Sequence, residues 1–294
     1  MFAPASLGAP RLAVLAEAAF GADPGRAATE LPPASDALGW WYRAVVLGGQ
    51  GRYAAARAEL RRVCNHSADS VLLSLAGSTE GSFLRQLGWH ERASALDGRA
   101  AALILPSGAA DEALMTESAP DAIAHYRPSR ADAICDALTG LAADALGTGR
   151  LALADRLLRR SAAAAGQLRT GWRPAVRLHW VSAETALAAG DSGSAAEHAA
   201  AALELAERAP SVRHQVKSRL LVAAAAAACD ARGRSVALSA EVAEQCRAHG
   251  LLPLRWACAM LRAGLGVEGA ETEAVECAAI VARRGGVLRP LGGR

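Results

Sequence analysis

Two short stretches match patterns that carry chemistry in other proteins, and neither has the context which that chemistry needs. Residues 190–193 spell Gly-Asp-Ser-Gly, the string around the nucleophile of trypsin-like proteases. That nucleophile works with a histidine and an aspartate that a β-barrel brings to it, whereas residues 190–193 stand at a turn between alanine-rich segments. Residues 264–269 spell GxGxxG, which indicates dinucleotide binding only between a strand and a helix. A helical segment precedes it here, so we interpret both stretches as turns.

The histidines and cysteines show none of the spacings that hold a metal ion. The sequence contains no HxxxH or HExxH pair, and Cys64 and His66 have no second ligand pair near them. The six cysteines show no CxxC spacing, which favours buried, free thiols in a reducing cytoplasm. No nucleophile or matched acid/base pair stands out. The sequence therefore predicts a protein that is not an enzyme and uses no metal or cofactor.

A polar stretch from residue 78 to residue 99 is the first candidate binding site. Spacings of three and four place Ser78, Ser82, Arg85 and Gln86 on one face of a helix. Such a face forms either a site for a partner or a structural network, and the sequence leaves both interpretations open.

His90, Asp97 and Arg99 follow in the next helix, and we expect them to be structural polar residues. Asp97 stands at a packing position, where an unpaired carboxylate would be costly. It therefore needs a cation as partner, and Arg85, Arg92 and Arg99 are the candidates. The resulting ion pair would lock one pair of helices together.

A stripe of arginine and tryptophan is the second candidate site. Pro174 suits the first turn of a helix, which places later side chains of the stripe on successive turns of one face. Arginine and tryptophan are frequent in binding hot spots, and arginine forms charge-assisted hydrogen bonds with carboxylates. The stripe either holds an acidic peptide or consists of solvated arginines with tryptophans buried between helices. Its residues are Arg173, Arg177, Trp180 and Glu184, followed further along by Arg213 and Lys217.

A recurring turn positions both candidate sites. A glycine followed five positions later by alanine stands between two alanine-rich stretches, and the copies recur about 40 residues apart, with a longer interval after the second, as in helical hairpins. Runs of strand-forming residues are scarce, so the predicted fold class is all-α. The copies begin at Gly51, Gly88, Gly149 and Gly190, with weaker ones at Gly233 and Gly269.

The first units resemble tetratricopeptide repeats. The residues that carry the resemblance are Trp40, Ala44, Leu47, Gly51, Tyr53, Ala56, Leu60 and Val63, then Gly77, Gly81, Leu84, Gly88, His90, Ala93, Ala100 and Pro106. Later units keep only the small positions. The resemblance implies a right-handed solenoid of antiparallel helix pairs, with about 12 to 13 helices. It also implies a concave groove, lined by the first helix of each pair, that holds peptides.

The sequence divides into a cap, residues 1–34, and a repeat domain, residues 35–294. The cap holds a helix from about Pro10 to Phe20 and a linker, and Ser35 is the expected N-cap of the next helix. Residues 105–132 form an irregular insertion rich in proline, with a weakly helical middle. Such an insertion is either functional, or it is mobile or simply packs over the edge of the repeats.

Charge and hydrophobic content limit the possible partners. The net charge is only +3, and Lys217 is the sole lysine among 32 basic residues, which fits a GC-rich bacterial coding sequence better than selection for phosphate contacts. Nucleic acid is therefore disfavoured as a partner. The N-terminus lacks a basic leader region, and no apolar stretch is long enough to span a bilayer. We expect a cytoplasmic protein without membrane contact.

The main functional prediction is a protein–protein interaction scaffold that binds a protein or peptide, with an acidic partner favoured by the arginines. One alternative is a regulatory module of transcription or signalling that acts through a sigma factor, an anti-sigma factor or a DNA-binding partner. Its basis is a resemblance to the helical repeats of large bacterial transcription regulators and signalling ATPases. Another alternative is nucleic-acid binding through an arginine-rich groove. The oligomeric state does not follow from the sequence.

Overall fold

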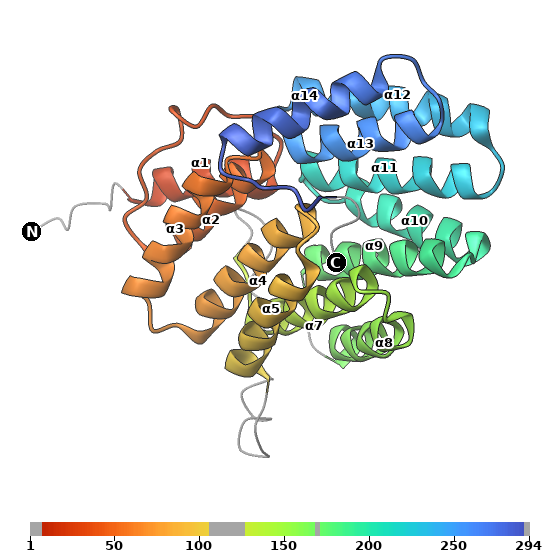
Figure 1. The fold of residues 1–294 in the computed structure, drawn as a ribbon. Helices are drawn as coiled ribbons and strands as arrows, with labels where there is room; N and C mark the ends of the chain where they lie inside the picture. Colours follow the sequence, from red (N-terminus) through yellow and green to blue (C-terminus); the bar gives the residue numbers. More distant parts are fainter. Residues whose placement is uncertain (1–7, 106–126, 168–170, 291–294) are drawn as a thin grey trace, which may run out of the picture.

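The chain is helical throughout the part that its computed structural model describes, residues 8–105, 127–167 and 171–290 (Figure 1). These ranges contain 13 helices and no strand, which confirms the all-α prediction. Most of the insertion expected at 105–132 lies outside the described residues. The helices are α1 (Gly8–Phe20), α2 (Ala37–Gly49), α3 (Tyr53–His66), α4 (Ser70–Gln86), α5 (His90–Ile104), α7 (Arg130–Gly147), α8 (Leu151–Gln167), α9 (Trp172–Ala189), α10 (Ser192–Glu207), α11 (Val212–Ala228), α12 (Arg232–Ala248), α13 (Leu252–Gly264) and α14 (Ala270–Arg283).

Short polar side chains fix where two of the inner helices begin. The Asp36 carboxylate accepts a hydrogen bond from the Gly39 amide at 2.7 Å, so the N-cap of α2 is Asp36. The prediction of Ser35 was wrong by one residue, because it is Asp36 whose side chain reaches the third amide of the helix. Ser129 and Asp132 form a reciprocal capping box at the start of α7.

Glycines in the left-handed region make most of the turns within the helix pairs, as the recurring motif predicts. Glycine adopts this conformation at little steric cost. The φ angles are 72° at Gly51, 85° at Gly88, 75° at Gly149, 77° at Gly190 and 75° at Gly269. The pair α11/α12 differs, because Gly233 lies inside α12 and Asp230 takes the left-handed position, with φ of 56°. Assigning that turn to Gly233 was wrong, since aspartate also tolerates this conformation.

Consecutive helices contact one another in six pairs that follow one another around a common centre. Extensive contacts join α2 with α3, α4 with α5, α7 with α8, α9 with α10, α11 with α12, and α13 with α14, and contacts of similar extent join α5 with α7 and α10 with α11. Alanines make close approach possible, and Ala44, Ala56 and Ala93 are fully buried. Figure 1 shows the pairs in order around the molecule, so that the last pair returns to the side of the first.

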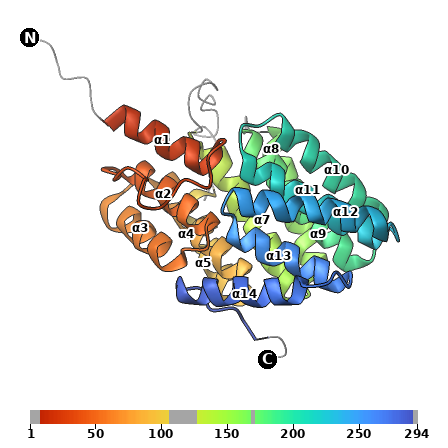
Figure 2. The same ribbon diagram turned by 90° about the horizontal axis from the view of Figure 1, so that it is seen from above.

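The first and last pairs are joined by a shared core and by backbone hydrogen bonds. Leu252 and Val281 belong to the same hydrophobic cluster as Trp41. The segment after α14 accepts hydrogen bonds across the junction: the Ala54 amide donates to the Arg284 carbonyl at 3.0 Å, and Trp89 Nε1 donates to the Val287 carbonyl at 2.7 Å. The described pairs therefore close into a ring. Seen from above, α1 and the segment after α14 lie at opposite edges of it (Figure 2).

The first helix of every pair faces the centre of the ring. Helices α2, α4, α7, α9, α11 and α13 all contribute side chains to one central cavity, and among the second helices only α5 contributes one, His90 at its start. No described helix combines the length and apolar character needed to cross a membrane.

Candidate functional site

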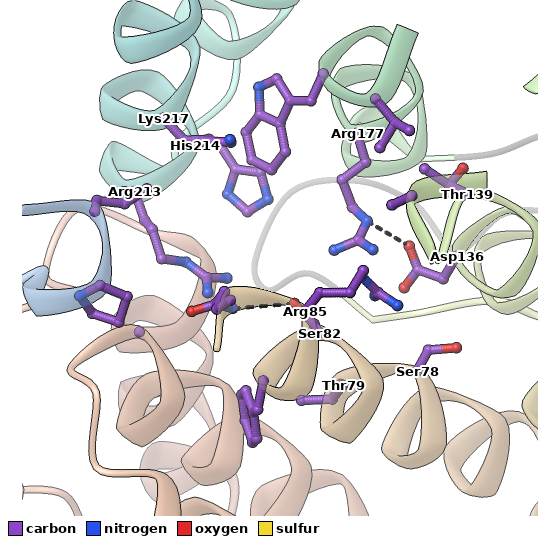
Figure 3. A pocket seen from close by; sticks show the side chains of 18 of the residues that line it. Ser78, Thr79, Ser82, Arg85, Asp136, Thr139, Arg177, Arg213, His214 and Lys217 are labelled. Atoms are coloured by element: carbon purple, nitrogen blue, oxygen red, sulfur yellow. Dashed lines mark hydrogen bonds and ion pairs between the residues drawn. The ribbon is translucent and has the colours of Figure 1, made fainter. Parts of the chain in front are cut away.

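The central cavity has a volume of about 580 Å³, within the range of roughly 300–1,000 Å³ that is usual for ligand sites. It brings together both stretches that the sequence singled out, although they lie far apart along the chain (Figure 3). The predicted residues that line it are Ser78, Ser82, Arg85 and Gln86 from α4, His90 from α5, Arg173, Arg177, Trp180 and Glu184 from α9, and Arg213 and Lys217 from α11.

Two arginines of α9 face one carboxylate of α7. The Arg173 guanidinium hydrogen-bonds to Asp136 and lies over the rings of Phe20 and Trp41, with its central carbon 5.5 and 5.9 Å from their centroids. Arg177 Nε lies 3.1 Å from the other Asp136 oxygen, close enough for an ion pair but without the alignment of a hydrogen bond. A single carboxylate therefore serves two guanidinium groups, and Arg177 is the less completely neutralised.

Arg213 has no carboxylate partner among the described residues. Its guanidinium carbon lies 5.9 Å from the centre of the Phe20 ring, and its side chain runs close to Gly49, where an added Cβ would be 3.3 Å from Arg213 Cδ. Burial lowers the pKa of Arg213 to about 10, and the nearby charges of Arg173 and Arg177 add to this effect. The group remains protonated at neutral pH, so an unbalanced positive charge faces the cavity.

An aromatic wall flanks these arginines. The Trp180 and His214 rings stack with centroids 5.1 Å apart and an angle of 19°, and Trp172 meets His214 edge-on at 4.8 Å. His214 Nδ1 shares a hydrogen bond of 2.8 Å with the Ser211 hydroxyl. Burial lowers the pKa of His214 well below its usual value, and Arg213 lowers it further. His214 is therefore neutral at physiological pH and acts as part of the wall.

Lys217 is the other basic side chain that α11 contributes to the cavity, and its charge is balanced. Its Nζ donates to Glu184 at 2.6 Å and lies 5.9 Å from the centre of the Trp180 ring. Arg177, Trp180 and Glu184 all reach the cavity from α9, as their spacing predicts.

Arg85 joins three helices through two buried carboxylates. One terminal nitrogen, Nη1, donates to Asp97 on α5 and to Asp144 on α7, the latter at 3.1 Å. Burial opposes protonation of Arg85, but both carboxylates raise its pKa above the usual value. Burial raises the pKa of Asp97, and it raises that of Asp144 to about 7, against the effect of Arg85.

The partner expected for Asp97 is therefore present, but two details of that prediction were wrong. Arg99 is exposed and takes no part in the network, and Arg92 lies over Trp89 at 4.4 Å. The network also reaches Asp144, so it links two helix pairs and does not lock only one.

Asp136 and Asp144 were missed at the sequence level. Asp136 lines the cavity, whereas Asp144, eight residues later on α7, is buried against Arg85. Carboxylates repeated along a largely apolar helix were the signal that pointed to buried ion pairs. The aromatic residues Phe20 and Trp256, which also line the cavity, gave no comparable signal.

The two motif-like stretches lie at turns. Gly190 ends α9 and Asp191 caps α10, where its carboxylate accepts from the Ser194 amide at 3.0 Å. Residues 264–269 connect α13 to α14. Within the described ranges, no three histidine, cysteine or acidic side chains form a group that fits a metal ion.

Comparison with models of known protein families gives no match, and comparison with curated protein sequences gives none either.

Proposed function

We propose that this protein is an interaction scaffold, built from tetratricopeptide-like helix pairs in a solenoid, that binds an acidic peptide segment of a partner protein in its central cavity. The observation that carries the proposal is the unbalanced positive charge at Arg213 and Arg177 within a partly open cavity that is lined in part by aromatic side chains. An acidic side chain placed there would form charge-assisted hydrogen bonds, which are about twice as strong as neutral ones.

The other cations of the cavity wall support this assignment of the binding groups. Arg85 already has Asp97 and Asp144, and Lys217 has Glu184. A negatively charged ligand therefore gains most at Arg213 and Arg177. The adjacent Trp180 offers apolar surface to the rest of the ligand.

The shape of the site favours a short segment over nucleic acid. The unbalanced cations lie inside a cavity of the size that suits a drug-like ligand. A nucleic acid needs a basic face that follows its phosphate backbone over several nucleotides.

Retention of defined peptides on the immobilised protein tests the proposal. Acidic, neutral and basic peptides of equal length would be passed over the wild type, Arg213→Glu and Arg160→Glu. Arg160 is the matched control because it is exposed on the outer helix α8. We expect the wild type and Arg160→Glu to retain acidic peptides and Arg213→Glu to lose them. Failure of the wild type to retain any peptide, or equal retention by Arg213→Glu, would exclude peptide binding in this cavity.

A further inference from the structure

The charge at the centre of the cavity adds up to two unbalanced positive charges. Asp136 accepts the hydrogen bond of Arg173 and so balances one guanidinium. Arg177 and Arg213 then remain without a carboxylate of their own among the described residues. We call these two residues the arginine pair.

The arginine pair is arranged to meet one group from two sides. Arg177 comes from α9 and Arg213 from α11, and Figure 3 shows both side chains reaching into the same space above α4. Only Nε of Arg177 faces Asp136, which leaves its terminal nitrogens available to a ligand. Arg213 donates no hydrogen bond within the described part of the chain.

The guanidinium groups repel one another, and an ideal ligand would balance their positive charges. Burial lowers the pKa of Arg177 and of Arg213, and Arg173 lowers both further. A singly charged carboxylate would balance one of the two charges. A dianion would balance both, and a phosphate group also offers three acceptor oxygens to forked guanidinium donors.

We propose that the arginine pair, Arg177 and Arg213, is a subsite for a phosphate monoester dianion whose organic part lies against the aromatic wall at Trp180. This inference rests on the proposed function, since it states which acidic group the bound segment carries. The same chemistry could come from a phosphorylated side chain of a partner or from a small organic phosphate.

Phenyl phosphate and phenyl sulfate form the sharpest pair of probes. The two have similar shape, but at neutral pH the phosphate carries about one more negative charge than the sulfate, because its second pKa is about 6. Calorimetric titration of the wild type should show phenyl phosphate binding at least about tenfold more tightly, the effect of one additional charge-assisted contact. Equal affinity for the two probes, or binding of neither, would overturn the proposal.

A pH series separates titration of the ligand from titration of the protein. Between about pH 7.5 and 5 the phosphate gains a proton whereas the sulfate does not. The titratable groups of the wall, namely Asp136, Glu184, His90 and His214, and the carboxylates of Asp97 and Asp144 behind Arg85, act on both probes. The preference for phenyl phosphate should therefore shrink toward acidic pH, and a preference that stays constant would contradict the proposal.

Variants then locate the subsite. Arg213→Gln should remove most of the preference for phosphate over sulfate, whereas Arg160→Gln on the outer helix α8 should retain it. If Arg213→Gln does not fold, Arg177→Gln serves the same purpose, and the wild-type comparison of the two probes stands without either variant. An unchanged preference in a folded Arg213→Gln protein would place the phosphate elsewhere.

Peptides with and without a phosphorylated residue distinguish the two possible sources of the phosphate group, a modified partner protein and a small organic phosphate. Preferential retention of the phosphorylated set supports a modified partner. Equal retention of both sets overturns the phosphate subsite but leaves the proposed function in place. Tight binding of phenyl phosphate without retention of any peptide supports the subsite, assigns it to a small organic phosphate, and excludes the proposed function.

Discussion

Asp97 and Asp144 contact the same terminal nitrogen of Arg85, although they belong to different helix pairs. Both carboxylates are completely buried, and each has one oxygen without a hydrogen-bond partner among the described residues. One guanidinium balances only one negative charge. A proton shared between the carboxylates is therefore favoured in the folded protein, in agreement with the raised pKa of Asp144 at about 7.

The contribution of Asp144 to the stability of the fold should fall as pH rises from about 4 to 7, whereas the lowered pKa of His214 acts in the opposite direction. In this window the folded protein still holds the Asp144 proton, whereas the unfolded chain, with an aspartate pKa of about 3.9, has lost it. Because one pKa unit corresponds to about 1.4 kcal/mol and the two pKa values differ by about three units, we expect this contribution to fall by up to about 4 kcal/mol in urea unfolding. Asp144→Asn should flatten this dependence, whereas Asp155→Asn on the exposed side of α8 should not. A slope that Asp144→Asn leaves unchanged would argue against the shared proton.

Removing the shared guanidinium should be strongly destabilising. Arg85→Met leaves two buried carboxylates without a cation, which costs about 3–5 kcal/mol at neutral pH. The cost should be smaller in acid, where the carboxylates are protonated. Arg99→Met is the matched control: Arg99 is exposed on α5, and we expect a change within about 0.5 kcal/mol. Equal chemical denaturation curves for the two variants would show that Arg85 has no structural role.

Two glycines on neighbouring helices should respond oppositely to alanine. A Cβ at Gly140 would collide with the Asp97 carboxylate, whereas a Cβ at Gly98 would meet no atom within 4 Å. Gly140→Ala should cost about 1–3 kcal/mol, because the packed ion pair must shift. Gly98→Ala should gain roughly 0.5–1 kcal/mol, since alanine is the better helix former. Thermal unfolding measures both, and a stabilised Gly140→Ala would contradict the close approach of Asp97 to α7.

The cysteines should separate into two reactive and four protected thiols. Cys64 and Cys229 are exposed, while Cys135, Cys246, Cys258 and Cys277 are buried. Burial raises the pKa of Cys64, and Glu80 raises it further, so less thiolate is present at neutral pH. A colorimetric thiol reagent should label two sites in the native protein, with Cys64 the slower, and all six after denaturation. Rapid labelling of more than two sites in the native protein would show that the ring opens readily.

Sequence patterns predicted the features that depend on neighbouring residues. The glycine turns follow from the need for a positive φ. The turn at Asp230 was not predicted from the glycine pattern, because aspartate also fits the left-handed region. The cavity faces of α4 and α9 follow from helical spacing, which places Arg85 and Arg177 on the inner side.

Features that depend on contacts between distant pairs could not be predicted. The approach of Arg213 on α11 to Phe20 on α1 requires the ring to close, and a repeat period specifies only how each pair meets the next. The pairing of Arg173 with Asp136 likewise depends on the angle between α7 and α9. Asp97 showed that a cation was needed, but only the fold decides which cation reaches it.

The junction at which Trp89 donates to the Val287 carbonyl fixes the number of helix pairs. In an open array a pair can be added or lost, because each pair contacts only its neighbours and the ends are capped. Here an inserted or deleted pair would separate Leu252 and Val281 from the cluster around Trp41 and leave two apolar faces exposed at once. The protein is therefore expected to tolerate single substitutions better than a change in the number of helix pairs.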